Sequence, residues 1–425
     1  MSEKISLSRR SFGKLAGAAG IGALVGSGAL TGTSAQAAPA WRTTGTAVSA
    51  LKSFDDQMKA FMQARGVQAG QLAVTYRGRL VLARGYTYSN DSTLSVQPTS
   101  LFRIASLSKS LTASALARLA QDGKLNLGSP VTSFLDLTPP EGQTRDARLA
   151  NVTLWRLLQH TGGWDRDISG DTPSMSRTIA KALGVPLELR HSDVIRYSSG
   201  RPLDFKPGSG YAYGNYGYQL AGRIVEKVSG MSYESYVRQK LLNPLGITRM
   251  KLGNSISRHA GEVPYESQYT GVTVLDNSGT IVPTPYGAFS MRLHDSSAGW
   301  VASAVDLVRW ARAFDKGSAA LNDYSLGRVF AKPETGINAE GYYYGLGWYV
   351  QPKTTGNGRT TWHTGNLPGT YSLLMRTYED MSWAALFNQR DDPSGLPYSD
   401  IKSAMWDARR GVTSWPSHDL FPQYF

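Results

Sequence analysis

The stretch FRIASLSK, residues 102–109, places a serine and a lysine three positions apart, at Ser106 and Lys109. Leucines at helical spacing follow this pair, and Gly123 then provides a natural end to a helix. Side chains three positions apart lie on one face of a helix, where an amine lowers the cost of forming an alkoxide beside it. Because Ser106 lies near the positive helix end, the dipole adds to this effect. The stretch therefore indicates a nucleophilic serine with an adjacent amine.

Two motifs downstream carry residue types that can serve such a serine. Tyr213 and Asn215 form a Tyr-x-Asn in a glycine-rich turn before a predicted helix that ends at Gly230. Residues 363–365 spell His-Thr-Gly, and an alternating apolar stretch at 371–388 follows them. That alternation predicts a hairpin, with the His-Thr-Gly segment as an edge strand beside it.

Each of the three motifs also occurs a second time in the chain. Ser-x-x-Lys recurs at 11–14, Tyr-x-Asn at 88–90 and His-Thr-Gly at 160–162. The first copy lies in a segment that export would remove, and the second precedes the serine. The third follows a predicted helix, where we interpret Gly162 and Gly163 as capping residues. Order along the chain therefore selects Ser106, Tyr213 and His363.

In that order, the motifs resemble the class C-like branch of the serine β-lactamase and penicillin-binding-protein superfamily. The branch includes class C β-lactamases, a D-alanyl-D-alanine carboxypeptidase, D-aminopeptidases and carboxylesterases. Flanking segments match as well: LLQHTGG at 157–163, SAVDL at 303–307 and YGLGW at 344–348. The resemblance extends from about Phe54 to about Arg410. It implies a serine hydrolase with its active site in a cleft between two lobes.

The resemblance also implies roles for the motif residues. Ser106 would be the nucleophile, and Lys109 and Tyr213 are the two candidates for the base that takes its proton. An ordinary lysine or tyrosine is protonated at neutral pH, so burial or a neighbouring cation must lower its pKa. The resemblance favours Tyr213 as the proton shuttle, while the sequence leaves the choice open. Asn215 would orient Lys109 and hydrogen-bond the substrate.

The substrate side of the site would involve the His-Thr-Gly strand. The resemblance places the oxyanion hole at the backbone N–H groups of Ser106 and Asn366. His363 belongs to the catalytic group, and Thr364 and Gly365 would contact the substrate. Most β-lactamases of this superfamily carry lysine where His363 stands, and a histidine near pH 7 is mostly neutral. A D-amino-acid peptide or an ester is therefore a better expected substrate than a β-lactam.

The remaining pattern predicts an α+β fold. Both ends of the chain contribute to one predicted antiparallel sheet. Its elements are a hairpin at 72–83 and strands at 343–351, 358–363, 371–377 and 382–388, with a helix at 48–65 and a closing helix at 399–410. Helices flank this sheet, and a mostly helical second lobe is inserted, as in β-lactamases and transpeptidases. The predicted organisation is a signal peptide at 1–37, a linker at 38–47, an α/β lobe at 48–125 and 290–412, a mainly helical lobe at 126–289 and a tail at 413–425.

The N-terminus predicts export. The first residues have the pattern typical of a twin-arginine signal with its cleavage site. They contain SRRSFGK at 8–14, then a weakly apolar stretch, and Ala-Gln-Ala at 35–37. The chain has no cysteine, so we expect neither disulfides nor a lipid-modified cysteine as a membrane anchor. No zinc-hydrolase motif occurs, and neither a metal nor a cofactor is expected. The net charge is +13, but the basic residues are dispersed and do not indicate nucleic acid.

Together these features predict a secreted serine hydrolase that works through an acyl-enzyme on Ser106. A D-alanyl-D-alanine carboxypeptidase or D-aminopeptidase-like activity comes first, and a carboxylesterase or weak β-lactamase of the same family is the alternative. A non-catalytic protein that binds peptidoglycan or a β-lactam is the alternative from another class. The expected partners are a small-molecule or peptidoglycan-peptide substrate and the twin-arginine export machinery.

Overall fold

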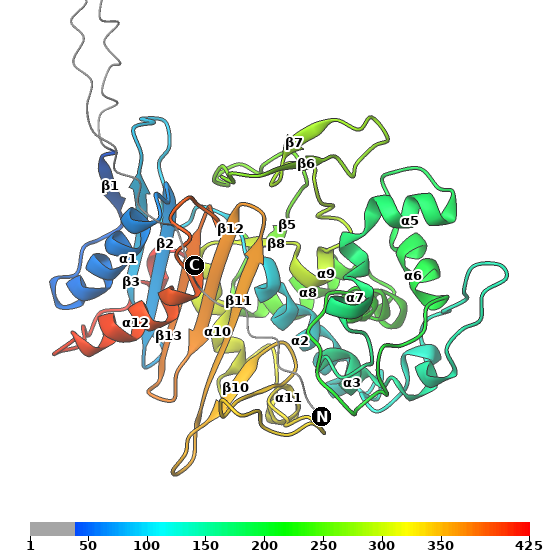
Figure 1. Cartoon of the computed structure of the whole chain (residues 1–425). Helices are drawn as coiled ribbons and strands as arrows, with labels where there is room; N and C mark the ends of the chain where they lie inside the picture. The colour runs from blue at the N-terminus through cyan, green and yellow to red at the C-terminus, as the bar shows by residue number, and fades with distance from the viewer. Residues whose placement is uncertain (1–38) are drawn as a thin grey trace, which may run out of the picture. The chain divides into compact units, whose positions relative to one another are not determined.

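Two stretches from opposite ends of the chain build the main sheet (Figure 1). The computed structural model describes residues 39–425, and the predicted signal peptide lies outside them. Eight antiparallel strands occur in the order β1-β3-β2-β13-β12-β11-β10-β9. Their bounds are β1 Trp41–Thr44, β2 Ala69–Tyr76, β3 Arg79–Tyr88, β9 Tyr343–Tyr344, β10 Tyr349–Pro352, β11 Arg359–Leu367, β12 Thr370–Arg376 and β13 Met381–Phe387.

Helices cover both faces of this sheet. The helices α1 (Lys52–Ala64) and α12 (Ile401–Arg410) pack against each other and enclose one apolar cluster with the sheet. On α1, Phe54, Met58 and Phe61 recur at the spacing of one helix face, which explains why that face is buried. The helix α10 (Ala304–Ala311) packs on β13 and β2 from the other side.

A mostly helical region lies beside that second face. Its helices are α3 Leu154–Leu158, α4 Arg166–Ser169, α5 Ser176–Leu183, α6 His191–Ser199, α7 Tyr216–Ser229, α8 Tyr233–Val237, α9 Asp295–Ala298 and α11 Asp323–Val329. Two small sheets join it: β4 (Phe102–Arg103) with β8 (Trp300–Ala302) and β5 (Lys251–Leu252), and β6 (Thr270–Val272) with β7 (Ile281–Pro283).

Single helical turns complete these elements. Short 3-10 turns lie at Ser49–Leu51, Ala105–Leu107, Val131–Ser133, Ala147–Asn151, Thr172–Ser174, Asn243–Leu245, Arg312–Phe314, Tyr398–Asp400 and Phe421–Gln423, and a π-helical turn at Arg238–Leu242.

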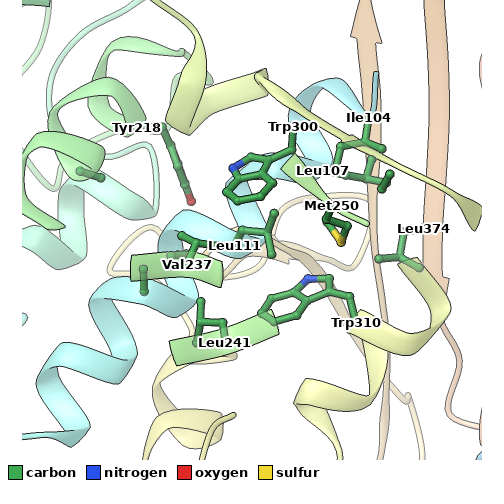
Figure 2. Close-up of a cluster of buried hydrophobic side chains, with 14 of the residues drawn as sticks. Ile104, Leu107, Leu111, Tyr218, Val237, Leu241, Met250, Trp300, Trp310 and Leu374 are labelled. Atoms are coloured by element: carbon green, nitrogen blue, oxygen red, sulfur yellow. The ribbon is translucent and has the colours of Figure 1, made fainter. Parts of the chain in front are cut away.

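The helix α2 (Ser108–Gln121) occupies the centre of the molecule between sheet and helices. It contacts α7, α9 and α11, and nearly all of its residues are buried. Figure 2 shows Leu107 and Leu111 packed with Trp300 and Trp310 in this core. Both indole N–H groups are satisfied, Trp300 by Tyr233 at 3.0 Å and Trp310 by a serine of α2 at 2.9 Å. The helix that follows Ser106 is therefore held on all sides.

The predicted α+β class, with an antiparallel sheet flanked by helices, is confirmed. One strand prediction is wrong: β11, which holds His-Thr-Gly, lies inside the sheet between β12 and β10. The pairing with β10 ends at Trp362, so the half that begins at His363 extends past β10. The predicted linker also differs, because Trp41–Thr44 pair with β3 and Trp41 stacks on Tyr88 at 4.6 Å.

The C-terminal tail, whose packing the sequence left open, lies against the sheet. Trp415 stacks on Tyr76 at 4.4 Å, and the Leu420 amide donates to the Leu80 carbonyl at 2.9 Å. Leu420 and Phe421 are buried. Within residues 39–425, each helix falls short of the length and apolar character needed to cross a membrane.

Candidate active site

Ser106 lies in a 3-10 turn, Ala105–Leu107, that leads directly into α2. Between Leu101 and Ala117 it is the only residue that is not buried. Ala105 has φ 48°, a left-handed conformation that costs a residue with a side chain about 1–2 kcal/mol. Two hydroxyls of β12 hold this turn: Thr370 donates to the Arg103 carbonyl and Ser372 to the Ile104 carbonyl, both at 2.8 Å.

Lys109 is fully buried and points at the Ser106 hydroxyl. Its Nζ lies 3.1 Å from Ser106 Oγ, 2.7 Å from Asn215 Oδ1 and 3.0 Å from the Ser297 carbonyl oxygen. Burial lowers the pKa of Lys109 to about 7, against the opposing charge of Asp171. A large share of the neutral amine is thus present at neutral pH, with a lone pair that can accept a proton.

Tyr213 lies beside the same pair. Its ring is 4.8 Å from Lys109 Nζ, and its phenol interacts with the Ser106 hydroxyl. Burial raises the pKa of Tyr213, and the neighbouring Tyr349 adds to the shift. The phenol is therefore protonated at neutral pH. Of the two candidate bases, Lys109 is the one whose environment favours the form that accepts a proton.

Asp171 is a site residue that sequence reasoning missed. Its carboxylate accepts from the Asn215 backbone N–H at 2.9 Å and from Asn215 Nδ2 at 2.6 Å. Because the amide nitrogen faces Asp171, the amide oxygen faces Lys109. Asp171 thus fixes the orientation of Asn215. Its partner lies 44 residues further along the chain, so no local pattern could have predicted the contact.

His363 is buried and makes two hydrogen bonds. Its Nδ1 lies 2.6 Å from the Thr364 carbonyl oxygen, and its Nε2 lies 2.9 Å from the Tyr344 hydroxyl. A carbonyl can only accept, so Nδ1 carries the proton and Nε2 accepts from Tyr344. Burial lowers the pKa of His363 to about 3, with Lys109 contributing. The imidazole is therefore neutral at physiological pH.

The rest of the β11 segment lies against the turn Ala105–Leu107. A side chain at Gly365 would collide with Ser372 Oγ and the Ile104 carbonyl, so glycine lets the strand approach the turn. The Thr364 hydroxyl interacts with the Tyr371 phenol. Asn366 Oδ1 accepts from an arginine, Arg390, at 2.7 Å. The oxyanion-hole and substrate roles of these residues stay predictions.

The second His-Thr-Gly copy also lies in this region. His160, and not the glycines after it, takes the left-handed position that ends α3, with φ 59°. The Thr161 amide then bonds the Arg156 carbonyl at 2.9 Å, as in a Schellman cap. The imidazole of His160 is 4.4 Å from the Tyr213 ring and 4.5 Å from the Tyr344 ring. Interpreting this segment only as a helix end therefore missed an aromatic neighbour of the site.

Metal ligation requires several converging His, Cys, Asp or Glu side chains, and within residues 39–425 no group of three is placed for it. The site instead combines a partly exposed serine, a buried lysine of lowered pKa and a tyrosine. This fold and this arrangement are those of the β-lactamase and penicillin-binding-protein superfamily.

Comparison with known proteins supports that class. The family model described as Beta-lactamase matches residues 54–401, and the chain belongs to this family. It is similar to Protein flp of Staphylococcus aureus (strain MRSA252), 26% identical over 321 residues that make up 74% of this chain and 58% of that protein. It is also similar to the Putative penicillin-binding protein PbpX of Bacillus subtilis (strain 168), 25% identical over 68% of this chain and 64% of that one. The chain thus spans little more than half the length of flp.

Solved structures share the fold. A penicillin-binding protein homologue from Pyrococcus abyssi, described as octameric, has a TM-score of 0.63 and 25% identity, covering 85% of this chain and 77% of that one. A D-stereospecific amidohydrolase from Streptomyces sp. has a TM-score of 0.62 and 19% identity, covering 84% of this chain and 98% of that one. D-amino acid amidase from Ochrobactrum anthropi SV3, complexed with D-phenylalanine, has a TM-score of 0.62 and 20% identity over 85% of this chain and 99% of that one.

Proposed function

We propose that this protein hydrolyses amide or ester bonds of D-amino-acid substrates through an acyl-enzyme on Ser106. One observation carries the proposal: the Lys109 amine lies 3.1 Å from Ser106 Oγ, and burial brings its pKa to about 7. A base whose pKa is near the working pH transfers protons most efficiently.

The proposed reaction uses the residues already placed around Ser106. Lys109 takes the hydroxyl proton while Oγ bonds to the substrate carbonyl carbon. The backbone N–H groups of Ser106 and Asn366 stabilise the oxyanion. Tyr213 gives its proton to the leaving nitrogen or oxygen as that bond breaks, and it recovers one from the Lys109 ammonium. Water then attacks the acyl-enzyme, and the same groups move the proton in reverse.

Two observations support a D-amino-acid amide or ester over a β-lactam. Two of the structural neighbours are described as acting on D-amino-acid or D-stereospecific amide substrates. In this chain His363 is neutral, with a pKa of about 3, and is already bonded to Tyr344. It therefore supplies no cation for the carboxylate of a cephalosporin or of a peptide C-terminus. A carboxylesterase activity is the second candidate, because a small ester needs no such cation.

Where the protein acts is also a proposal. The segment at 8–14 and the Ala-Gln-Ala at 35–37 support export of the folded enzyme through the twin-arginine pathway. In that compartment peptidoglycan peptides with D-residues are available substrates. Replacing Arg9 and Arg10 together by lysine would retain the precursor in the cell, and normal secretion of the double variant would refute this location.

A substrate panel tests the activity. Purified protein lacking residues 1–37 would be assayed with D- and L-amino-acid p-nitroanilides, a D-Ala-D-Ala peptide, p-nitrophenyl esters and nitrocefin, beside a Ser106→Ala control. We expect turnover of D- but not L-anilides, and slow or absent nitrocefin hydrolysis. Turnover of esters alone would favour the carboxylesterase. Fast nitrocefin hydrolysis would contradict the ranking of substrates.

A further inference from the structure

A pocket of about 160 Å³ lies next to the aromatic groups of the active site. Five tyrosines line it, and the loop at 333–338 forms much of the rest; the tyrosines are Tyr211, Tyr342, Tyr343, Tyr344 and Tyr349. Every described residue that lines it is uncharged. The rings support one another: Tyr349 meets Tyr344 edge-on at 5.0 Å and Tyr342 at 5.7 Å. These contacts give the pocket defined aromatic walls.

Three of the wall residues contact or adjoin residues of the active site. Tyr211 precedes Tyr213 by two residues in the same turn, and it hydrogen-bonds Tyr349. The Tyr344 hydroxyl that borders the pocket donates to His363. The Tyr349 ring is 5.4 Å from the His363 ring. The wall residue Tyr344 also lies 6.1 Å from the ring of Tyr213, the group to which we assign proton delivery to the leaving atom.

We propose that this pocket is a specificity subsite that binds an uncharged aromatic or branched aliphatic substituent on the leaving group of the substrate; this rests on the proposed function. The size fits, because an apolar protein cavity of roughly 150 Å³ holds a single benzene ring. The chemistry also fits, because a charged substituent would be buried without a partner among these walls.

The test varies only the leaving group and keeps the acyl group constant. Methyl, benzyl and 4-carboxybenzyl esters of one D-amino acid release alcohols of similar acidity, so differences in kcat/KM report binding of the substituent. We expect kcat/KM for the benzyl ester to exceed that for the methyl ester by about tenfold or more. The 4-carboxybenzyl ester should lose that advantage, because its carboxylate would have to be desolvated.

Two variants change the pocket in opposite directions. Tyr342→Ala enlarges it and should move the preference from the benzyl to a naphthylmethyl ester. Thr335→Trp fills it from an exposed rim position and should remove the benzyl advantage. Tyr324→Ala is the matched control, because this exposed tyrosine lies on α11 outside the pocket. Its ratio of benzyl to methyl kcat/KM should equal that of the wild type.

The outcomes separate this proposal from the general one. Equal kcat/KM for methyl and benzyl esters in the wild type, or equal ratios in all four proteins, would overturn the subsite while leaving the hydrolase intact. No turnover of any ester or amide, with no labelling of Ser106, would instead overturn the proposed function.

Discussion

Burial and Asp171 together set the protonation state of the Lys109 amine, on which the proposed acylation depends. Lys109 is buried against Ser106, and Asp171 reaches it through Asn215. Burial lowers the pKa of Lys109, while the negative charge of Asp171 raises it. These opposing effects leave the amine close to half-protonated near neutral pH, which is the range where a base is most useful.

The first prediction concerns the pH dependence of acylation. Because the pKa of Lys109 is about 7, the rate of labelling by a fluorophosphonate should rise with pH through about 7 and then level off. Labelling reactions stopped at fixed times, at pH values from about 5 to about 9, measure this rise in rate with pH. A rate that is flat across that range would show that Lys109 does not accept the proton.

Asp171→Asn should move the rise in labelling rate to lower pH, because it removes the charge that raises the Lys109 pKa. It should also reduce kcat by about tenfold or more, since the Asn215 amide loses the acceptor that orients it. If the role of Asp171 were purely structural, the substitution would lower the rate or the stability without changing the pH at which the rate rises. Asp171→Glu, which keeps the charge, should leave that pH closer to the wild-type value.

These contacts also show what the sequence could reveal at the residue scale. The proximity of Ser106, Lys109 and Asn215 was predictable, because each belongs to a short motif and the order of the motifs is specific. Asp171 and Tyr344 were not, because their partners lie 44 and 19 residues away. His160 was not predicted as a site neighbour, because it lies at a helix end. Its Nδ1 accepts a hydrogen bond at 3.4 Å from the backbone N–H of Gly214, which is 54 residues away.

At the scale of elements, the site depends on how closely β11 approaches the turn before α2. Ser372 and Thr370 of β12 bond the carbonyls of that turn, and Gly365 of β11 leaves room for it. This arrangement brings the third motif to the first although they are far apart in the chain. It also offsets the strain of the positive φ at Ala105.

Gly365→Ala should therefore displace β11 from the turn. Its new methyl group would collide with the Ile104 carbonyl and Ser372 Oγ, and it would lie 3.0 Å from Ala105 Cβ. We expect kcat/KM to fall by about tenfold or more, because small misplacements of reacting groups are costly. Gly327→Ala on α11 is the control, since a methyl group there meets nothing of the described chain within 4 Å. Equal activity of both variants and the wild type would disprove the close-approach argument.

The elements themselves were predictable to different degrees. The strands β2 and β3 are apolar runs separated by the turn Arg77-Gly78, and β12 and β13 lie within the apolar stretch at 371–388, so their positions followed from the sequence. The sequence predicted one strand at 343–351, where the structure has the two short paired strands β9 and β10. The pairing of β10 with β11 was not predicted, so β11 was mistaken for an edge. The strand β1, also four residues long, depends on pairing with β3 that only the fold reveals.

At the scale of the whole molecule, buried polar groups join distant segments. Arg103, which lies just before the turn that holds Ser106, donates to the Pro285 carbonyl at 2.6 Å and the Asn254 carbonyl at 2.7 Å. Three buried histidines, His160, His294 and His363, have lowered pKa values, chiefly because of burial. The folded protein therefore keeps these imidazoles neutral under conditions where the unfolded chain would protonate them.

Stability should consequently decrease in acid. An unfolded histidine binds a proton below about pH 6.5, whereas folded His363 does so only near its pKa of about 3. Between these values the unfolded state binds more protons, so the free energy of unfolding falls as pH falls. Urea unfolding at about pH 7 and about pH 5 measures how the free energy of unfolding changes with pH. His363→Asn should make this slope shallower. Parallel slopes in the two proteins would contradict a neutral, buried His363.

The central claim is that Ser106 is the nucleophile, and mass spectrometry after covalent labelling tests it most directly. Wild type and Ser106→Ala would be treated with a fluorophosphonate, digested and mapped, after circular dichroism has shown that both are folded. We predict a single adduct on the peptide that contains Ser106, no adduct in the variant, and a loss of turnover of roughly three to six orders of magnitude. An adduct on another serine, or near-normal turnover by folded Ser106→Ala, would contradict the account.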